Sequence, residues 1–326
     1  RLTEMGWIKH PMDQCCFMLV ANDKHSSHGS LRGMMILHVD DVLVTGCPTD
    51  KVFQDAVKSL RQQFNFGKWD VLTPTHSLKY CGGTIFQNEY GIEVSYAEYM
   101  KRISPVTIQK GRKDDQPITE HEKSKARGLI GALQWPATQG LPMLAASMSI
   151  QAGELAGAKI KELTELNKTL RFGKAHADVN LKFLATSTSQ SFGLDGLTIV
   201  CYADAAFCVR SDKTSQGGYV LMACDASVLK GKKVPASIVG WRSFKLPRVC
   251  RSSLAAECQA CSTALEELMM AKLFLQLLKN PCSSLREARD QLHGDECAMV
   301  TDCKGLFDAV KRETVQQATR SEERRV

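Results

Sequence analysis

The sequence predicts an α/β protein whose last third is a mixed sheet with helices. Three observations predict this fold class. Residues Leu197 to Phe207 (LTIVCYADAAF) form an apolar, β-branched run, which is typical of a buried strand. The stretch from Arg251 (RSSLAAECQACSTALEELMMAKLFLQLL) has the length and pattern of a long helix. Residues 297–302 (CAMVTD) form a second short apolar run, which predicts another strand.

Each of these three elements carries an acid. Asp204 closes the first apolar run, Glu257 lies inside the helical pattern, and Asp302 ends the second run. A carboxylate at the end of a buried strand is costly unless something pairs with it. Strand, helix and strand can bring their acids into one pocket, and three carboxylates in one pocket call for divalent cations. We therefore expect Asp204, Glu257 and Asp302 to be metal ligands.

Composition bounds the class of protein. The 326 residues suffice for two domains or three small ones, and the hydrophobic fraction of 44% is ordinary for a globular protein. No run of eighteen or more apolar residues is present, so no membrane span is expected. The net charge of +7 is compatible with a polyanionic partner.

The cysteines and the amino terminus indicate the compartment. Thirteen cysteines lie at irregular spacings, and the first residues (RLTEMGWIKH) show no signal-peptide pattern. We expect a reducing, intracellular location, cytoplasmic or nuclear. Cys258 and Cys261 form a C-x-x-C inside the predicted helix, which favours buried thiols over a zinc or redox site. The start reads like the middle of a domain, so we expect a fragment.

The first segment covers residues 1 to about 115. An apolar run over 33–37 leads to His38, Asp40 and Asp41, and a second run over 42–44 follows, which predicts a β-hairpin with both aspartates at its tip. On spacing alone the pair is either a polar turn or a metal site. The pattern further predicts these elements: strands over 15–20, 78–86 and 91–95, an amphipathic helix over 49–64, and a helix start over 96–103.

The middle segment runs from about residue 116 to 195. Residues 110–125 are dense in charge and contain Pro117, which predicts an exposed linker, with His121 solvated. Helices are expected over 123–135, 141–156 and 158–173, and a strand over 179–186. The polar stretch 187–196 is the expected domain boundary.

The final segment covers residues 196 to 326. Strands are predicted over 197–202, 218–224, 236–242 and 297–301, and a short helix over 304–310. Ser252 or Ser253 is expected to cap the long helix, which stops before Pro281. Small alanines at 255, 256 and 260 let that helix pack closely on the sheet near Glu257. The alternative role of Asp302 is a helix cap for residue 304 onward.

The motifs, taken in order, resemble a known family. YADAAF, SQGGYVL, IVGWRSFK, RSSLAAECQA and VTDCKGL resemble the ribonuclease H domain of copia-type retrotransposon polyproteins, and MMILHVDDVLVTG resembles the catalytic hairpin of their reverse transcriptase. The resemblance covers nearly the whole chain. It implies a partial reverse transcriptase palm over 1–115, a helical thumb and connection over 116–195, and a ribonuclease H-like domain over 196–326, truncated at its carboxyl end. The rest of the polyprotein is an implied partner.

The resemblance also implies an activity. Asp40 and Asp41 match the polymerase hairpin, but a further aspartate from an earlier strand is missing, so no independent DNA synthesis is expected. The implied reaction is Mg²⁺-dependent hydrolysis of RNA in an RNA–DNA hybrid, with two ions about 4 Å apart. Asp204 would bridge both ions, while Glu257 and Asp302 would each complete one shell.

The family uses a fourth acid near the carboxyl end to hold the second metal. Glu313, Glu322 and Glu323 are present, but none sits in a matching motif. We therefore expect the second metal site to be weakened. Two alternatives stay open: a catalytically inactive nucleic-acid-binding remnant, and a DNA-acting integrase or transposase of the same fold class.

Basic and hydroxyl residues near the predicted strand ends are candidates for contacts to the phosphates of a hybrid. They are Arg210, Lys213, Lys245, Arg248, Arg251, Ser252 and Ser253. Trp241 lies within an apolar strand, which favours a core position over a stacking platform.

Overall fold

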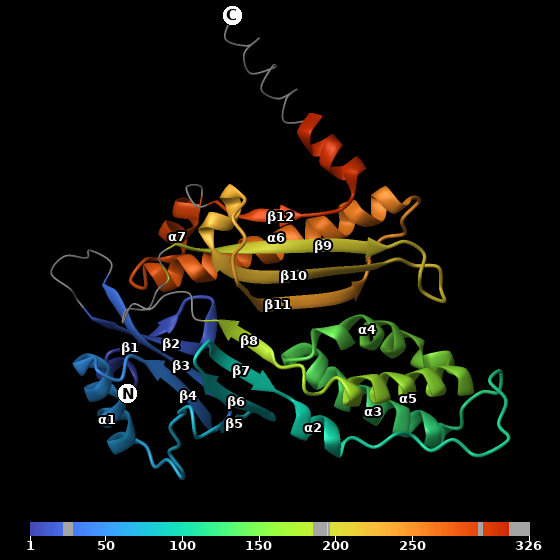
Figure 1. Cartoon of the computed structure of the whole chain (residues 1–326), viewed down its shortest axis with the longest axis horizontal. Coiled ribbons are helices and arrows are strands. Elements are labelled where there is room, and N and C mark those ends of the chain that lie inside the picture. The colour runs from blue at the N-terminus through green and yellow to red at the C-terminus, as the bar shows by residue number, and fades with distance from the viewer. Residues whose placement is uncertain (22–28, 185–193, 195, 293–295, 313–326) are drawn as a thin grey trace, which may run out of the picture.

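The computed structural model describes residues 1–21, 29–184, 194, 196–292 and 296–312. Within these residues the strands form three four-stranded sheets, and a group of helices lies beside them (Figure 1). The expected domain boundary at 187–196 falls largely outside the described residues, as do Glu313, Glu322 and Glu323.

The first sheet is an antiparallel meander in the order β1-β2-β3-β4. Its strands are β1 (Trp7–His10), β2 (Asp13–Ala21), β3 (Ser30–His38) and β4 (Asp41–Gly46). Helix α1 (Lys51–Gln63) follows, and Asp50 caps it by accepting a hydrogen bond from Phe53 N at 3.0 Å. The predicted hairpin and amphipathic helix are both confirmed as elements.

The second sheet has the order β5-β6-β7-β8. It contains β5 (Leu78–Tyr80), β6 (Gly83–Asn88), β7 (Gly91–Ser95) and β8 (Leu181–Leu184). Strand β8 pairs antiparallel with β7, with Val94 opposite Leu181. The strand predicted at the end of the middle segment therefore belongs to a sheet of the first segment.

The helical part contains α2 (Ala97–Arg102), α3 (Glu120–Gln139), α4 (Ala145–Glu154) and α5 (Ile160–Ala175), with short 3₁₀ turns over Pro142–Leu144 and Leu155–Gly157. Helix α3 begins at Glu120, three residues earlier than predicted, because Thr119 and Glu122 form a capping box. Glu122 is buried and bonded to Arg112 at 3.2 Å, so 110–125 is not the fully exposed linker that its charge predicts.

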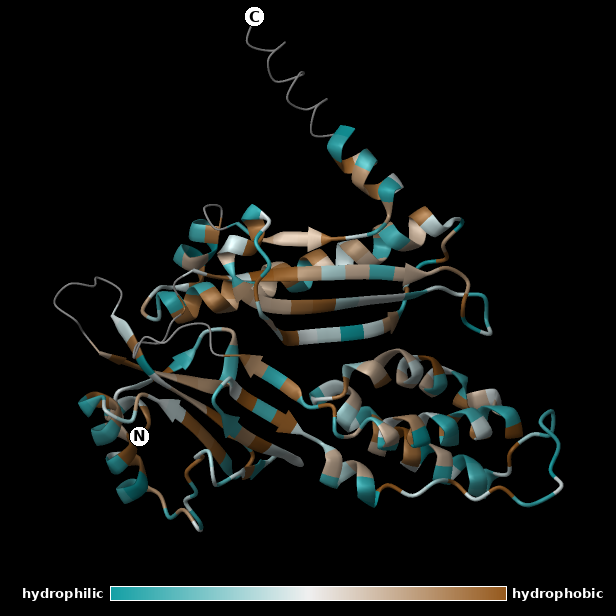
Figure 2. Ribbon diagram, viewed as in Figure 1, coloured by the Kyte–Doolittle hydropathy of each residue, from teal (hydrophilic) through white to brown (hydrophobic). Residues whose placement is uncertain are grey.

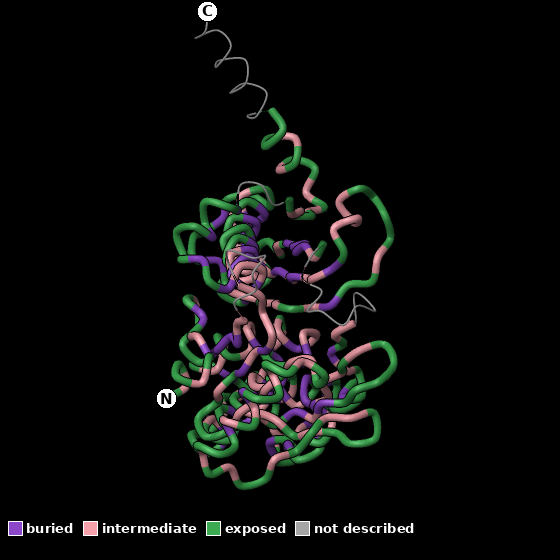
Figure 3. Tube along the Cα trace, turned by 90° about the vertical axis from the view of Figure 1, so that its left-hand side faces the viewer, coloured by how far each residue is buried: buried purple, intermediate pink, exposed green. Residues whose placement is uncertain are grey.

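The third sheet has the order β11-β10-β9-β12. Strands β9 (Leu197–Ala206), β10 (Gln216–Asp225) and β11 (Ala236–Lys245) are antiparallel neighbours, while β12 (Ala298–Val300) runs parallel to β9. Helix α6 (Ser253–Lys279) lies across one face, and α7 (Leu285–Gln291), which the sequence pattern did not predict, follows it (Figure 1). Residues 304–312 are helical, mostly exposed, and project away from the sheet (Figure 3).

Alternation along β9 determines which side chains meet α6. Ile199, Cys201 and Ala203 are buried against Cys261 and Leu268 of the helix. Figure 2 shows the hydrophobic residues along the first half of β9 and on α6 behind it. The alternate side chains of β9 point to the opposite face, where Thr198 and Val200 are buried but Tyr202 and Asp204 are exposed. The second half of β9 therefore has one covered face and one accessible face.

The helices and the second sheet cover the outer edge of β11. Trp241 Nε1 donates a hydrogen bond to the Ala137 carbonyl at 2.8 Å, and Leu184 N donates one to Ser237 Oγ at 2.9 Å. These contacts protect an edge strand from pairing with another chain. Among the described residues, no helix combines the length and apolar character needed to cross a lipid bilayer.

Candidate metal centre

Asp204, Glu257 and Asp302 converge. Each of the three side chains offers a carboxylate oxygen, and these oxygens lie within 4.8 Å of one another. Within the described part of the chain, this is the one group of three or more histidine, cysteine or acidic side chains close enough to share an ion.

Strand register places the two aspartates side by side. Val300 of β12 is the parallel neighbour of Tyr202 of β9. Asp302 and Asp204 each follow their register partner by two residues, so they end up adjacent at the same edge of the sheet. Strand β9 runs two residues past Asp204, because Gln216 of β10 still pairs with Ala206.

Glu257 reaches the same point from helix α6. Ala256 and Ala260, its neighbours on the helix, are fully buried, which lets the first turns of α6 approach the sheet closely. The Glu257 side chain lies near the covered face, while Asp204 and Asp302 are exposed to solvent. The centre is therefore covered by α6 on the side of Glu257 and open to solvent on the side of the two aspartates.

The electrostatics of the centre favour a cation. Burial raises the pKa of Glu257, and the negative charges of Asp204 and Asp302 raise it further. Glu257 is 9% exposed, and its Oε2 atom is buried with no hydrogen-bond partner among the described residues. A bound cation would satisfy this oxygen and offset the repulsion. Three carboxylates are hard oxygen ligands, the kind that Mg²⁺ accepts.

A groove opens directly onto the centre. It is a cavity of about 580 Å³ between the accessible face of the third sheet and the start of α4. Asp204 and Asp302 line one end of it, and Tyr202, Val220 and Trp241 line the sheet side. Pro142, Ala145 and Ala146 form the opposite wall.

Arg210 was expected to contact phosphate, and the structure corrects this expectation. Its side chain is buried, at 6% exposure. The guanidinium donates to Gln216 Oε1 at 2.6 Å and to the Ser149 carbonyl of α4 at 3.4 Å. Arg210 thus holds the β9–β10 loop against the helices, because a buried guanidinium needs fixed acceptors.

The other predicted phosphate contacts lie at the surface. Lys213 and Arg251 are exposed, as is Arg248. Lys245 is half-exposed and ion-paired with Asp212, and this contact holds the pKa of Asp212 well below its ordinary value.

Ser252 and Ser253 occupy different positions at the start of α6. The Ser252 hydroxyl accepts a hydrogen bond from Ala255 N at 3.1 Å, as the N-cap of α6. Ser253 is the first helical residue and is exposed. The cap predicted at one of the two positions is therefore Ser252.

Asp40 and Asp41 lie at the exposed turn between β3 and β4. Within the described residues they do not belong to a group of three potential metal ligands. The neighbouring His38 ring lies 6.4 Å from the ring of Tyr80, which ties the hairpin to the second sheet.

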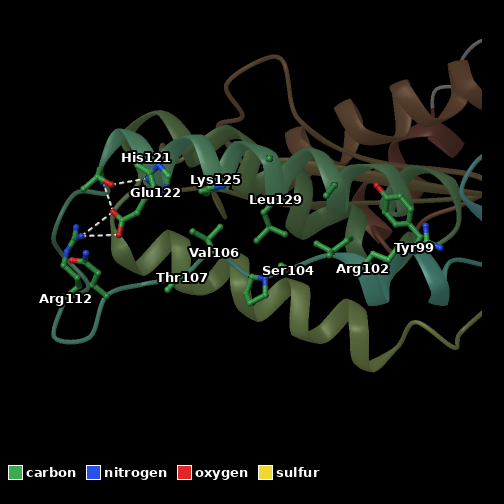
Figure 4. A pocket seen from close by; sticks show the side chains of 16 residues that line it. Tyr99, Arg102, Ser104, Val106, Thr107, Arg112, His121, Glu122, Lys125 and Leu129 are labelled. Atoms are coloured by element: carbon green, nitrogen blue, oxygen red, sulfur yellow. Dashed lines mark hydrogen bonds and ion pairs between the residues drawn. The ribbon is translucent and has the colours of Figure 1, made fainter.

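A larger cavity, about 960 Å³, lies away from the acids in the helical part. It runs between α3 and the chain that follows α2, and Figure 4 shows Arg112 bonded to Glu122 at one end of it. Both groups are already paired, so the cavity does not assemble a second centre of free carboxylates.

Sequence reasoning missed Tyr202 and Gly218. Both face the groove, and Gly218 is the direct cross-strand partner of Asp204. The available signal was the spacing of two between Tyr202 and Asp204, which places both side chains on one face of a strand.

These elements define a mixed α/β protein with a carboxylate centre at a sheet edge. No family model matches the chain, and no curated protein matches it. Among solved structures, it is similar to the foamy viral protease-reverse transcriptase in complex with RNA/DNA hybrid, with a TM-score of 0.33 and 10% sequence identity. The match covers 70% of this chain and 29% of that one.

Proposed function

We propose that this chain is a metal-dependent nuclease that hydrolyses RNA in an RNA–DNA hybrid, as part of a copia-type reverse transcriptase and ribonuclease H polyprotein. The observation that carries the proposal is the meeting of Asp204, Glu257 and Asp302 within 4.8 Å. The three acids come from a strand, a helix and the end of a second strand, the order expected from the apolar runs and the helical pattern of the sequence.

The three carboxylates would divide the work by position. Asp204 and Asp302 line the open groove, so they would hold a Mg²⁺ ion from the groove side. Glu257 lies behind them, where its buried Oε2 would hold the ion from the covered face. A bound ion supplies an activated water and stabilises charge on the phosphate oxygens.

The number of ligands favours unequal ion sites. Two-metal centres hold their ions about 4 Å apart. Three carboxylates can hold one ion firmly, while a second would share Asp204 and depend more on water and on the phosphate itself. We propose a tight site and a weaker one.

DNA synthesis is not part of the proposal. Asp40 and Asp41 stand at an exposed turn, without a third acid beside them among the described residues. Two aspartates on one hairpin do not make a two-metal clamp.

The test is cleavage of three matched, labelled substrates: an RNA–DNA hybrid, a DNA duplex and an RNA duplex, each with Mg²⁺ or with a chelator. We expect Mg²⁺-dependent cleavage of the RNA strand of the hybrid. Asp204→Asn should abolish it, whereas Glu266→Gln, an exposed acid on the same helix as Glu257, should retain it. Cleavage of the DNA duplex would instead select an integrase or transposase activity.

Binding of hybrid without cleavage would select the second candidate, a nucleic-acid-binding protein without nuclease activity. The exposed basic residues Lys213, Arg248 and Arg251 favour a nucleic-acid partner under either function.

A further inference from the structure

We propose that Gln216 is a positioning residue, which fixes helix α4 as a wall beside the metal centre so that the backbone of the bound hybrid lies in register with the acids. This inference rests on the proposed function and deepens it, since it names a residue that sets the place of the substrate by acting through α4.

Strand register places Gln216 on the face of the sheet that carries Asp204. Gly218 of β10 pairs with Asp204 of β9. Gln216 precedes Gly218 by two residues on the same strand, so its side chain points to the same face. Helix α4 lies on this face, because Gln216 Nε2 donates a hydrogen bond to Ser149 Oγ of that helix at 2.9 Å.

Both polar atoms of the Gln216 amide are bonded. The nitrogen donates to Ser149 Oγ and to Ser243 Oγ, each at 2.9 Å, and the oxygen accepts from the Arg210 guanidinium at 2.6 Å. Gln216 is 5% exposed and Arg210 is 6% exposed. A buried polar group that loses its partner costs more than its hydrogen bond contributes, so these four side chains hold one arrangement. We call them the polar lock.

Helix α4 approaches the polar lock closely at Gly153. A Cβ atom added to Gly153 would overlap the Arg210 guanidinium, which also donates to the Ser149 carbonyl at 3.4 Å. The acceptors in Ser149 and Gln216 keep the guanidinium at this place. The close approach of α4 to the sheet therefore depends on a glycine at this position.

The start of α4 is one wall of the groove that has Asp204 and Asp302 at its end. Trp241 Nε1 donates to the Ala137 carbonyl at 2.8 Å, which fixes the end of α3 just before this wall. The polar lock fixes α4 just after it. The acids come from β9, α6 and the end of β12, so a shift of the wall would change the groove and leave the centre in place.

The size of the groove indicates which part of a hybrid it accepts. Its volume of about 580 Å³ is that of a pocket for a small ligand. A stretch of the sugar–phosphate backbone of one strand has this size and a duplex does not, so the bases of the hybrid would stay paired outside the groove. Backbone contacts fix register and orientation without reading sequence. The wall is therefore expected to act on affinity for the hybrid and not on sequence preference.

The first measurement is equilibrium binding in chelator, which does not depend on cleavage. Fluorescence anisotropy gives the Kd of a labelled hybrid for each variant. We expect Gln216→Ala to weaken binding about two- to tenfold, the range that corresponds to the loss of one hydrogen bond. Gln216→Glu should bind within about twofold of the wild type, since a carboxylate can accept from Arg210 and from both serine hydroxyls.

Two glycines give a matched pair of variants. Gly153→Ala should displace α4 from the Arg210 guanidinium and weaken binding as Gln216→Ala does. Gly157→Ala is the same change four residues later, where an added Cβ atom meets nothing within 4 Å, and it should bind as the wild type does. Gly153→Ala retains every residue of the polar lock, so it carries the test if Gln216→Ala does not fold.

Steady-state kinetics distinguish positioning from damage to the centre. Gln216→Ala and Gly153→Ala should raise the KM for hybrid about two- to tenfold and leave kcat within about twofold. The rise of their melting temperature with Mg²⁺ should equal that of the wild type, because the three acids do not belong to α4. A fall in kcat with an unchanged KM would overturn the positioning role.

The outcomes separate the two proposals. A wild-type Kd for both Gln216→Ala and Gly153→Ala overturns the positioning role, even if Mg²⁺-dependent cleavage is intact. Weakened binding by these two variants, with Gln216→Glu and Gly157→Ala like the wild type, supports it even if no cleavage is seen and the nuclease proposal fails. Absence of any hybrid binding by the wild-type chain overturns both.

Discussion

Asp302 lies beside Asp204 because the strands that precede them, β12 and β9, are parallel and in register, with Val300 next to Tyr202. The two aspartates, which are 98 positions apart in the chain (302 − 204), are thereby fixed at one edge of the sheet. Glu257 completes the centre from helix α6, which packs on the covered face of the sheet.

Metal binding should be visible without any enzymatic assay. An ion that binds only the folded chain stabilises it by about 2.7 kcal/mol at a concentration a hundredfold above its Kd. We expect the melting temperature of the wild-type chain to rise with Mg²⁺ and that of Glu257→Gln to stay nearly constant. Glu266→Gln is the matched control and should respond as the wild type does. An equal rise for Glu257→Gln would contradict a role for Glu257 in holding the ion.

Arg210 and Arg251 should differ in salt dependence of hybrid binding. Each phosphate contact contributes about 0.9 to the slope of log K against log salt. Arg251 is exposed, so Arg251→Gln should lower the slope by about one. Arg210 is buried against Ser149 and Gln216, so Arg210→Gln should lower thermal stability and leave the slope unchanged. A reversed pattern in titrations over a salt series would refute this division of roles.

Glu122 should make stability depend on acidic pH. Hydrogen bonds from Thr119 and the charge of Arg112 lower the pKa of Glu122 from 4.5. A depressed folded pKa means that the carboxylate stabilises the fold above the unfolded value, and that this contribution is lost as pH falls below about 4.5.

The corresponding variant is Glu122→Gln. It should cost roughly 1–3 kcal/mol of unfolding free energy near neutral pH and flatten the loss below pH 4.5. Urea denaturation at several pH values measures both, with Glu120→Gln, an exposed acid two residues away, as control. Parallel pH profiles for Glu122→Gln and the wild type would count against the capping-box account.

Burial of His10 should make the folded protein less stable as the pH falls. It is 1% exposed, its ring lies 4.1 Å from the Phe274 ring of α6, and burial lowers the pKa of His10 from 6.5. The unfolded chain then binds more protons than the folded chain below pH 6.5, so stability falls as pH drops through that value.

Replacing the imidazole by a ring that cannot be protonated tests this. His10→Phe keeps an aromatic contact with Phe274 and should remove the part of the stability loss that sets in below pH 6.5. Denaturation curves at about pH 5, 6 and 7.5, which bracket the ordinary histidine pKa of about 6.5, give the unfolding free energy of the two chains. If the difference in unfolding free energy between the two chains is the same at all three pH values, His10 does not titrate in this range.

The sequence predicted elements better than their partners. The apolar run of β9 and the alanines of α6 were readable because burial leaves a periodic pattern. The sequence did not show which sheet β8 joins, because its pairing with β7 depends on residues far apart in the chain. Arg210 was assigned to a phosphate contact from its charge and its place near a predicted strand end, although its side chain is buried and its acceptors come from Ser149 and Gln216. Glu122 was missed for a similar reason, because its partner Arg112 lies in the preceding loop.

Part of the candidate site was also readable. Three acids on strand, helix and strand could be named from their local context, but Tyr202 and Gly218 could not, since their significance comes from register with β10, β11 and β12. A side chain becomes part of a groove only when another element forms the opposite wall, here the start of α4.

The most direct measurement is the rate of RNA-strand cleavage in a labelled RNA–DNA hybrid, with and without Mg²⁺, for the wild-type chain and Asp204→Asn. The account predicts cleavage by the wild type that requires Mg²⁺ and is lost in Asp204→Asn. Cleavage that persists in chelator, or that is equal in Asp204→Asn, would contradict the claim that Asp204, Glu257 and Asp302 form a catalytic metal centre.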